Sequence, residues 1–116
     1  MKPKPKPINL LPYYPLELVK DCLRKGRYQI RPNAAAGALK YFRWREKDII
    51  EALLKLDALM CYKAEPHDTL PGVMVDLYRC EKLHDDENVY THFYIIYGNE
   101  TSTYDTLIIN SFHNLF

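Results

Sequence analysis

The hydrophobic residues of this chain change their spacing near residue 60. Before that point apolar side chains recur every three or four residues, the spacing of one helix face, and after it they alternate with polar ones, as in strands. Helices followed by strands predict an α+β domain, with N-terminal helices packed on a C-terminal antiparallel β-sheet. A chain of 116 residues is the size of one domain and can bury a hydrophobic core without disulfides.

Three segments of the first half have helical spacing. The first covers 15–25, with a proline in its first turn and Gly26 at its end. The second covers 33–41, with Asn33 as its expected N-cap. The third covers 46–56, with acidic residues in the first turn, where the helix dipole favours them. Residues 28–30 are expected to form a short extended link between the first two helices.

The second half predicts strands joined by loops. The strongest expected strand is 89–97, which is rich in aromatic and β-branched residues. The other expected strands are 60–64, 73–78 and 104–112, separated by a proline-containing loop at 65–72, an acidic loop at 81–88 and a turn at 98–103.

Residues 1–12 are expected to be a basic, flexible tail, because Lys and Pro alternate through Pro7 and favour an extended polyproline conformation. Such an arm could follow phosphates, or it could only add solubility. The remainder, 13–116, is then a single domain.

Charge is divided unevenly along the chain. Residues 1–63 hold 14 Lys and Arg against six acidic residues, a net charge of +8, whereas 64–116 hold two against nine, a net charge of −7. This division suggests a polyanionic partner for the basic half. The alternative is that the two halves neutralise each other in the fold.

The composition excludes several other classes. Cys22, Cys61 and Cys80 are odd in number and widely spaced, so neither a disulfide framework nor a zinc motif is indicated. A metal site made of His67, His84 and Asp85 would require a coincidence of loop residues, and no metal or cofactor is expected. The basic start lacks the apolar segment of a signal peptide, and no apolar run is long enough to cross a bilayer, which predicts a cytoplasmic protein.

A group of residues remote in sequence carries the chemistry of a metal-free ribonuclease. Such an enzyme removes the proton of the RNA 2′-OH, protonates the leaving 5′-oxygen and stabilises the charge on phosphorus. Tyr90 and His92 are two residues apart on an expected strand and therefore share a face. His92 is the expected proton carrier, Lys63 a catalytic cation and Arg79 a phosphate ligand. Each of these could instead be an ordinary exposed or packed side chain.

Further residues are expected to contact RNA. Tyr78 and His113 are placed in this group beside Arg79, and His67 lies in a loop near Lys63. Tyr94 or Tyr97 could stack a base, although alternation puts them on opposite faces. His84 is expected to face solvent.

Several segments together resemble the motility quorum-sensing regulator toxins, the MqsR family. They are LVKDCLRKGRYQIR, IIEALLKLDA, CYK, DLYR, VYTHFYI and DTLIINSF, which span about residues 15 to 112. The resemblance implies a RelE-like fold, an mRNA interferase of a type II toxin–antitoxin pair, and a cognate antitoxin as protein partner.

The resemblance also implies site residues. The family's active-site Lys and Tyr fall on Lys63 and Tyr90, and a basic residue of the family falls on His113. The chain departs from the family at three positions, with His92 for a Lys, Val75 for a Gln and Glu65 for a Met. These departures leave open a related fold that binds RNA or an antitoxin without cleavage. A third alternative, which does not depend on them, is a protein-interaction module that uses an exposed strand edge and a Tyr-rich face.

Overall fold

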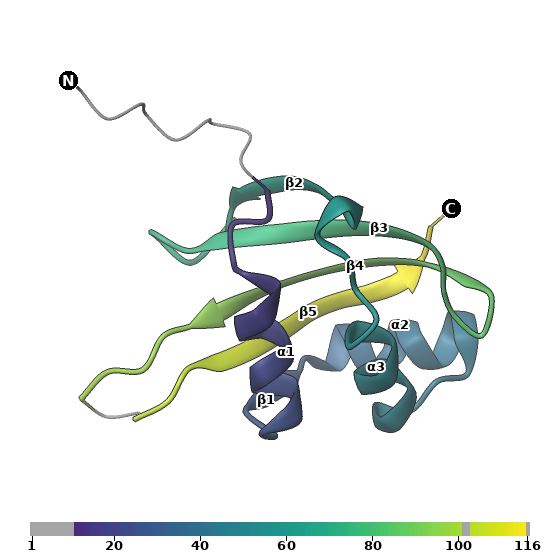
Figure 1. The fold of residues 1–116 in the computed structure, drawn as a ribbon, viewed down its shortest axis with the longest axis horizontal. Coiled ribbons are helices and arrows are strands. Elements are labelled where there is room, and N and C mark those ends of the chain that lie inside the picture. Colours follow the sequence, from purple (N-terminus) through teal and green to yellow (C-terminus); the bar gives the residue numbers. More distant parts are fainter. Residues whose placement is uncertain (1–10, 101–102, 116) are drawn as a thin grey trace.

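The computed structural model describes residues 11–100 and 103–115, which form three helices and a five-stranded mixed sheet (Figure 1). The α+β class is confirmed. In the described part of the chain, no helix is long and apolar enough to cross a membrane. The tail expected at 1–12 lies outside the described residues except for Leu11 and Pro12, and Leu11 already packs against the core.

The three helices lie where the spacing predicts them, with different ends. They are α1 (Leu16–Arg24), α2 (Pro32–Phe42) and α3 (Glu46–Leu53), and a short 3₁₀ turn, η1 (Ala58–Met60), precedes the second strand. Asn33 is not the N-cap of α2, since Arg31 holds that position and Pro32 takes the first turn, where a missing N–H costs nothing. Helix α3 ends at Leu53, earlier than the expected residue 56. Leu56 is still buried in the core, which explains why the apolar spacing continues beyond the end of the helix.

The strands are β1 (Tyr28–Ile30), β2 (Cys61–Pro66), β3 (Met74–His84), β4 (Glu87–Ile96) and β5 (Thr106–Asn114), in the order β1-β5-β4-β3-β2. The expectation of a purely antiparallel sheet is wrong, because the link at 28–30 pairs with β5 in parallel. The acidic loop expected at 81–88 is also wrong. There β3 and β4 continue into a hairpin that turns at Asp85 and Asp86, both with positive φ, and Leu83 is buried inside it.

Helices α1 and α3 cover one face of the sheet (Figure 1), which we call the covered face. The core between them and the sheet contains Tyr78, Phe93 and Phe112. The third helix, α2, runs along the edge of β5 beyond its pairing with β1. Gly37 permits this approach, since a Cβ at that position would collide with the carbonyl oxygen of Phe112.

Asp76 is the main polar group inside the covered face. It is fully buried, and its carboxylate accepts hydrogen bonds from the backbone N–H groups of Tyr13, at 2.9 Å, and Tyr14, at 2.8 Å. Burial raises its pKa above 3.8, while those two hydrogen bonds oppose the rise. The side chain thereby fastens the segment before α1 to the middle of the sheet.

Candidate functional site

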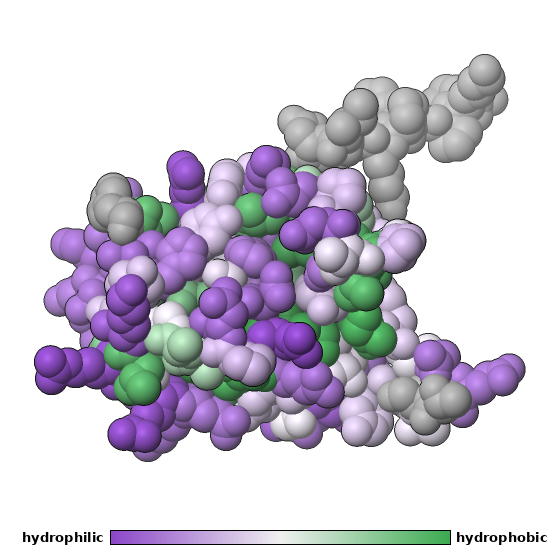
Figure 2. Space-filling view, turned by 180° about the vertical axis from the view of Figure 1, so that it is seen from behind, coloured by the Kyte–Doolittle hydropathy of each residue, from purple (hydrophilic) through white to green (hydrophobic). Residues whose placement is uncertain are grey.

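The other face of the sheet has no covering helix, and we call it the open face. Strand register and alternation place there Lys63 and Glu65 of β2, Arg79 of β3, Tyr90 and His92 of β4, and Ser111 and His113 of β5. Seen from behind the covering helices, the surface is mostly hydrophilic (Figure 2). Five of the residues predicted for a site therefore lie together here: Lys63, Arg79, Tyr90, His92 and His113.

Tyr90 lies between two imidazoles. Its ring stacks on His113, with centroids 4.5 Å apart and planes at 24°, and it meets the ring of His92 edge-on at 5.8 Å. The strand register explains this, since Tyr90 pairs with His113 across the β4–β5 ladder and His92 is the next residue on the same face. Three groups that can carry or donate protons are thus held on two neighbouring strands, all partly exposed.

Tyr62 is a member of the site that sequence analysis missed. The register of β2 against β3 shifts between Cys61 and Lys63, so Tyr62 sits in an irregularity of the ladder. Its hydroxyl donates to the hydroxyl of Tyr90 at 3.4 Å, and the Arg79 guanidinium lies 4.5 Å above its ring. A cation held over an aromatic ring beside Tyr90 is an anchoring point for an anionic ligand. Alternation alone could not reveal it, because the irregularity breaks alternation.

Lys63 lies on the open face but is paired. Its Nζ is 2.9 Å from Glu65, and both side chains are about half exposed. The hydrogen bond and charge of Glu65 raise the pKa of Lys63 above 10.5, so the amine stays charged. Exposed ion pairs of this kind contribute little to stability. Lys63 can therefore exchange Glu65 for a phosphate at small cost, but Glu65 also brings a negative charge to the site.

His92 is held in its neutral form. Burial lowers its pKa below 6.5, and the neighbouring His113 adds to the shift. Its Nδ1 lies 3.2 Å from the amide nitrogen of Asn110. Asn110 is the extra residue where the β4–β5 register shifts. A side-chain amide can offer either a donor or an acceptor at this position, so Asn110 suits both tautomers of His92.

The other two ring groups are also fixed. Burial, followed by the hydrogen bond from Tyr62, raises the pKa of Tyr90 above 10.0, so the phenol stays protonated and acts as a donor. Nδ1 of His113 lies 2.7 Å from the carbonyl oxygen of Asn114 and donates to it, which leaves Nε2 to face a ligand.

A hollow of about 340 Å³ adjoins the site between α2 and β5. It shares Ser111 and His113 with the open face and is further lined by Asn33, Lys40 and Tyr41. Lys40 lies 5.2 Å above the ring of Tyr41. Asn33 therefore lines a cavity and does not cap its helix.

Other predicted residues have different surroundings. Tyr78 is fully buried in the covered face and stacks on Phe93, so its assignment to RNA contact is wrong. Its neighbour Arg79 points the opposite way, as alternation requires. Tyr94 is also buried, which removes it as a base platform, whereas Tyr97 is half exposed.

Two histidines differ from expectation as well. Nδ1 of His67 accepts from the backbone N–H groups of Thr69 and Leu70, both at 3.1 Å, so His67 shapes its own loop beside the open face. His84 does not face solvent: it is buried, and it lies next to carboxylates of α3. It forms the one metal-ligand grouping found within the described residues, with Asp48 and Glu51.

No protein-family model matches this chain, and no curated protein matches it in sequence.

Proposed function

We propose that this protein is a metal-independent endoribonuclease, an mRNA interferase, that acts as the toxin of a type II toxin–antitoxin pair with a RelE-like fold. The observation that carries the proposal is Tyr90 held between His92 and His113 on an open sheet face, beside Arg79. The segment resemblance to MqsR toxins supports the same activity and supplies the antitoxin as partner.

The two histidines divide the proton chemistry. His92 is neutral because of its lowered pKa and serves as the general base for the 2′-OH. Protonated His113 donates through Nε2–H to the leaving 5′-oxygen. A charged His113 is itself one cause of the low pKa of His92, so the pair favours one acid and one base at the same time.

Phosphate binding falls to the groups around Tyr90. Arg79 offers a planar fork of donors, and the Tyr90 phenol, which stays protonated, donates one further hydrogen bond to the charge that develops on phosphorus. Lys63 adds a positive charge once Glu65 releases it. The neighbouring hollow, with Lys40 and Tyr41, offers a cation and an aromatic ring to the next nucleotide along the strand.

The test is cleavage of a long single-stranded RNA by purified protein in EDTA. We expect discrete fragments that end in 2′,3′-cyclic phosphates, and a rate reduced about 100-fold or more in His92→Gln. His67→Gln is the comparison variant, because His67 borders the same face but bonds its own loop and packs on Tyr94, so its rate should fall far less than that of His92→Gln. Intact RNA with wild-type protein would refute the proposal.

One observation favours the second candidate, a protein of this fold that binds RNA or an antitoxin without cleaving RNA. Glu65 forms an ion pair with Lys63 and places a negative charge where a phosphate would approach. Salt-sensitive binding of an RNA that remains intact would identify this alternative. Restored cleavage in Glu65→Gln would show that Glu65 alone suppresses the activity.

A further inference from the structure

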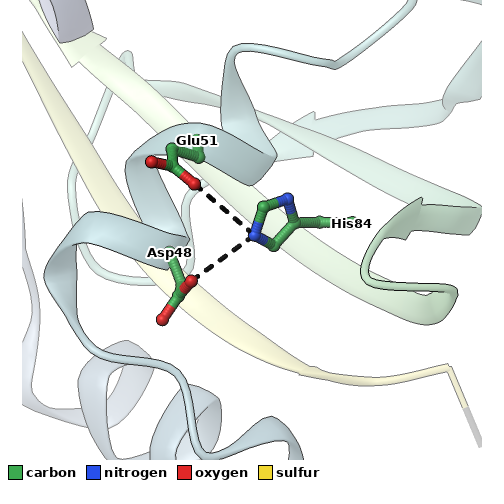
Figure 3. Close-up of side chains that lie close together, drawn as sticks. All are labelled: Asp48, Glu51 and His84. Atoms are coloured by element: carbon green, nitrogen blue, oxygen red, sulfur yellow. Dashed lines mark hydrogen bonds and ion pairs between the residues drawn. The ribbon is translucent and has the colours of Figure 1, made fainter.

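His84 lies where α3 meets the β3–β4 hairpin, on the covered side of the sheet and away from the residues proposed to cleave RNA. Its side chain is 7% exposed, and its Nε2 points at the carboxylates of α3 (Figure 3). Asp48 and Glu51 are three residues apart in α3 and so lie on one helix face. Asp85, in the hairpin turn, also contacts the imidazole, but its carboxylate is not one of the mutually close ligand atoms.

The contacts between His84 Nε2 and these carboxylates are long for hydrogen bonds. Nε2 of His84 is 3.5 Å from Asp48, 3.8 Å from Glu51 and 3.6 Å from Asp85. A good N–H···O bond is about 2.9 Å long. Two ligands about 2.1 Å from a tetrahedral zinc ion are about 3.4 Å apart, which is close to the observed separations. The carboxylates of Asp48 and Glu51 therefore stay at a distance from the imidazole that leaves room for an ion between the three groups.

We propose that His84, Asp48 and Glu51 form a binding site for a divalent transition metal, with Zn²⁺ as the preferred ion and water as its fourth ligand. One imidazole and carboxylate oxygens are donors that zinc accepts at four-coordinate sites. The ligand atoms of His84, Asp48 and Glu51 already lie within 4.8 Å of one another. The two carboxylates are at least one-third exposed, so they can contract around an ion while the buried histidine fixes its position.

Lys55 controls access to this site. Its Nζ lies 2.8 Å from Nδ1 of His84 and donates to it, which places the imidazole proton on Nε2, the ligand atom. Metal binding requires that proton to move to Nδ1 and the ammonium to leave. Lys55 is exposed, so it can withdraw. Lys55→Gln should therefore bind the ion more tightly, because it removes a competing charge and can offer an acceptor to Nδ1–H.

A bound ion would connect α3 to the hairpin, two elements remote in sequence. Binding to the folded state alone raises stability by mass action, so added Zn²⁺ should raise the melting temperature. This inference does not depend on the proposed nuclease activity, since the site lies on the covered side and the RNA chemistry uses no metal. A negative result for the metal site would therefore not affect the proposed nuclease activity, and the reverse also holds.

The test is titration of the untagged, full-length protein with Zn²⁺, followed by calorimetry and melting temperature, with Co²⁺ as a visible probe. We expect one ion per chain and a four-coordinate Co²⁺ spectrum without the near-ultraviolet band of thiolate ligands, since Cys22, Cys61 and Cys80 are buried elsewhere. Mg²⁺ and Ca²⁺ at equal concentration should not bind comparably. Absence of Zn²⁺ binding, or equal binding of Mg²⁺, would overturn the proposal.

Variants locate the ion. Asp48→Asn and Glu51→Gln should each weaken Zn²⁺ affinity by about tenfold or more, and both keep side-chain volume if His84→Gln proves unstable. Asp86→Asn is the matched control. It neutralises a carboxylate of the hairpin turn that follows β3, which is not a proposed ligand, and should leave the Zn²⁺ affinity unchanged. Equal affinity in wild type, Asp48→Asn and Glu51→Gln, or weaker binding in Lys55→Gln, would show that the cluster is only an ion-pair network.

Discussion

The two faces of the sheet use the same strands for opposite purposes. On the covered face two buried polar groups have close partners from other segments: Asp76 accepts from the amides of Tyr13 and Tyr14, and the Thr91 hydroxyl donates to the carbonyl of Ser111 at 2.7 Å. On the open face Tyr90 is held mainly by ring contacts and by a long hydrogen bond of 3.4 Å.

The difference separates stability from ligand binding. Asp76 and Thr91 have satisfied their hydrogen bonds and have little left to offer a ligand. Tyr90 is positioned mainly by stacking, which leaves its own O–H proton accessible to a ligand. A substitution on the covered face should therefore change folding, and one on the open face should change chemistry.

The largest expected effect is on folding. Asp76→Ala removes the acceptor of two backbone N–H groups, one of them buried, and should lower the free energy of unfolding by about 2–4 kcal/mol. Asp57→Ala is the control, because Asp57 also accepts a backbone N–H, from Leu59, but is exposed. Urea denaturation measures both. Equal losses would contradict the importance of burial.

The next effect is on cleavage. Tyr90→Phe removes a donor aimed at the phosphate and should slow RNA cleavage about 10–100-fold with little change in melting temperature. Tyr78→Phe makes the same chemical change on the covered face and should leave the cleavage rate intact. Similar rates for the two variants would remove Tyr90 from the site.

The pH dependence follows from His92. A general base works in its neutral form, and the pKa of His92 lies below 6.5. The cleavage rate should therefore rise with pH through a midpoint below 6.5. A single-turnover pH profile measures this, and a midpoint above 6.5 would argue against the buried, neutral imidazole.

Glu65→Gln should act on the same profile in a smaller way. The negative charge of Glu65 raises the pKa of His92, so its removal should shift the rising limb to lower pH. It should also free Lys63 and increase the rate by a few-fold. Asp68→Asn, which neutralises a second acid that affects His92 but does not bind Lys63, separates the two effects. A Glu65→Gln profile that shifts without a faster rate would exclude Lys63 from phosphate binding.

The smallest effect concerns the hydroxyl of Tyr78, which is buried without a hydrogen-bond partner among the described residues. Tyr78→Phe removes an unsatisfied polar group and keeps the ring that stacks on Phe93. It should leave stability unchanged or raise it by up to about 1 kcal/mol. A clear destabilisation in thermal melts would show that the hydroxyl does have a partner.

Much of this site could be predicted from local rules. Alternation alone puts Tyr90 and His92 on one face, and it also excludes Tyr78 from the face that holds Arg79, an exclusion that the sequence prediction overlooked. The contribution of Tyr62 and Asn110 could not be predicted, because each lies at a register shift set by the neighbouring strand. The burial of His84 could not be predicted either, because its partners Asp48 and Glu51 come from a helix far earlier in the chain.

The sequence by itself determined where the three helices and the central parts of four strands lie, because the spacing of apolar residues and the turn residues act within a few positions of the chain. Only the tertiary structure decided that residues 28–30 join the sheet in parallel, that α1 and α3 cover one face, and that the other stays open. These outcomes depend on which segments, remote in sequence, bury the most apolar surface against each other. The free energy of that burial depends on both segments, so it cannot be read from either one alone.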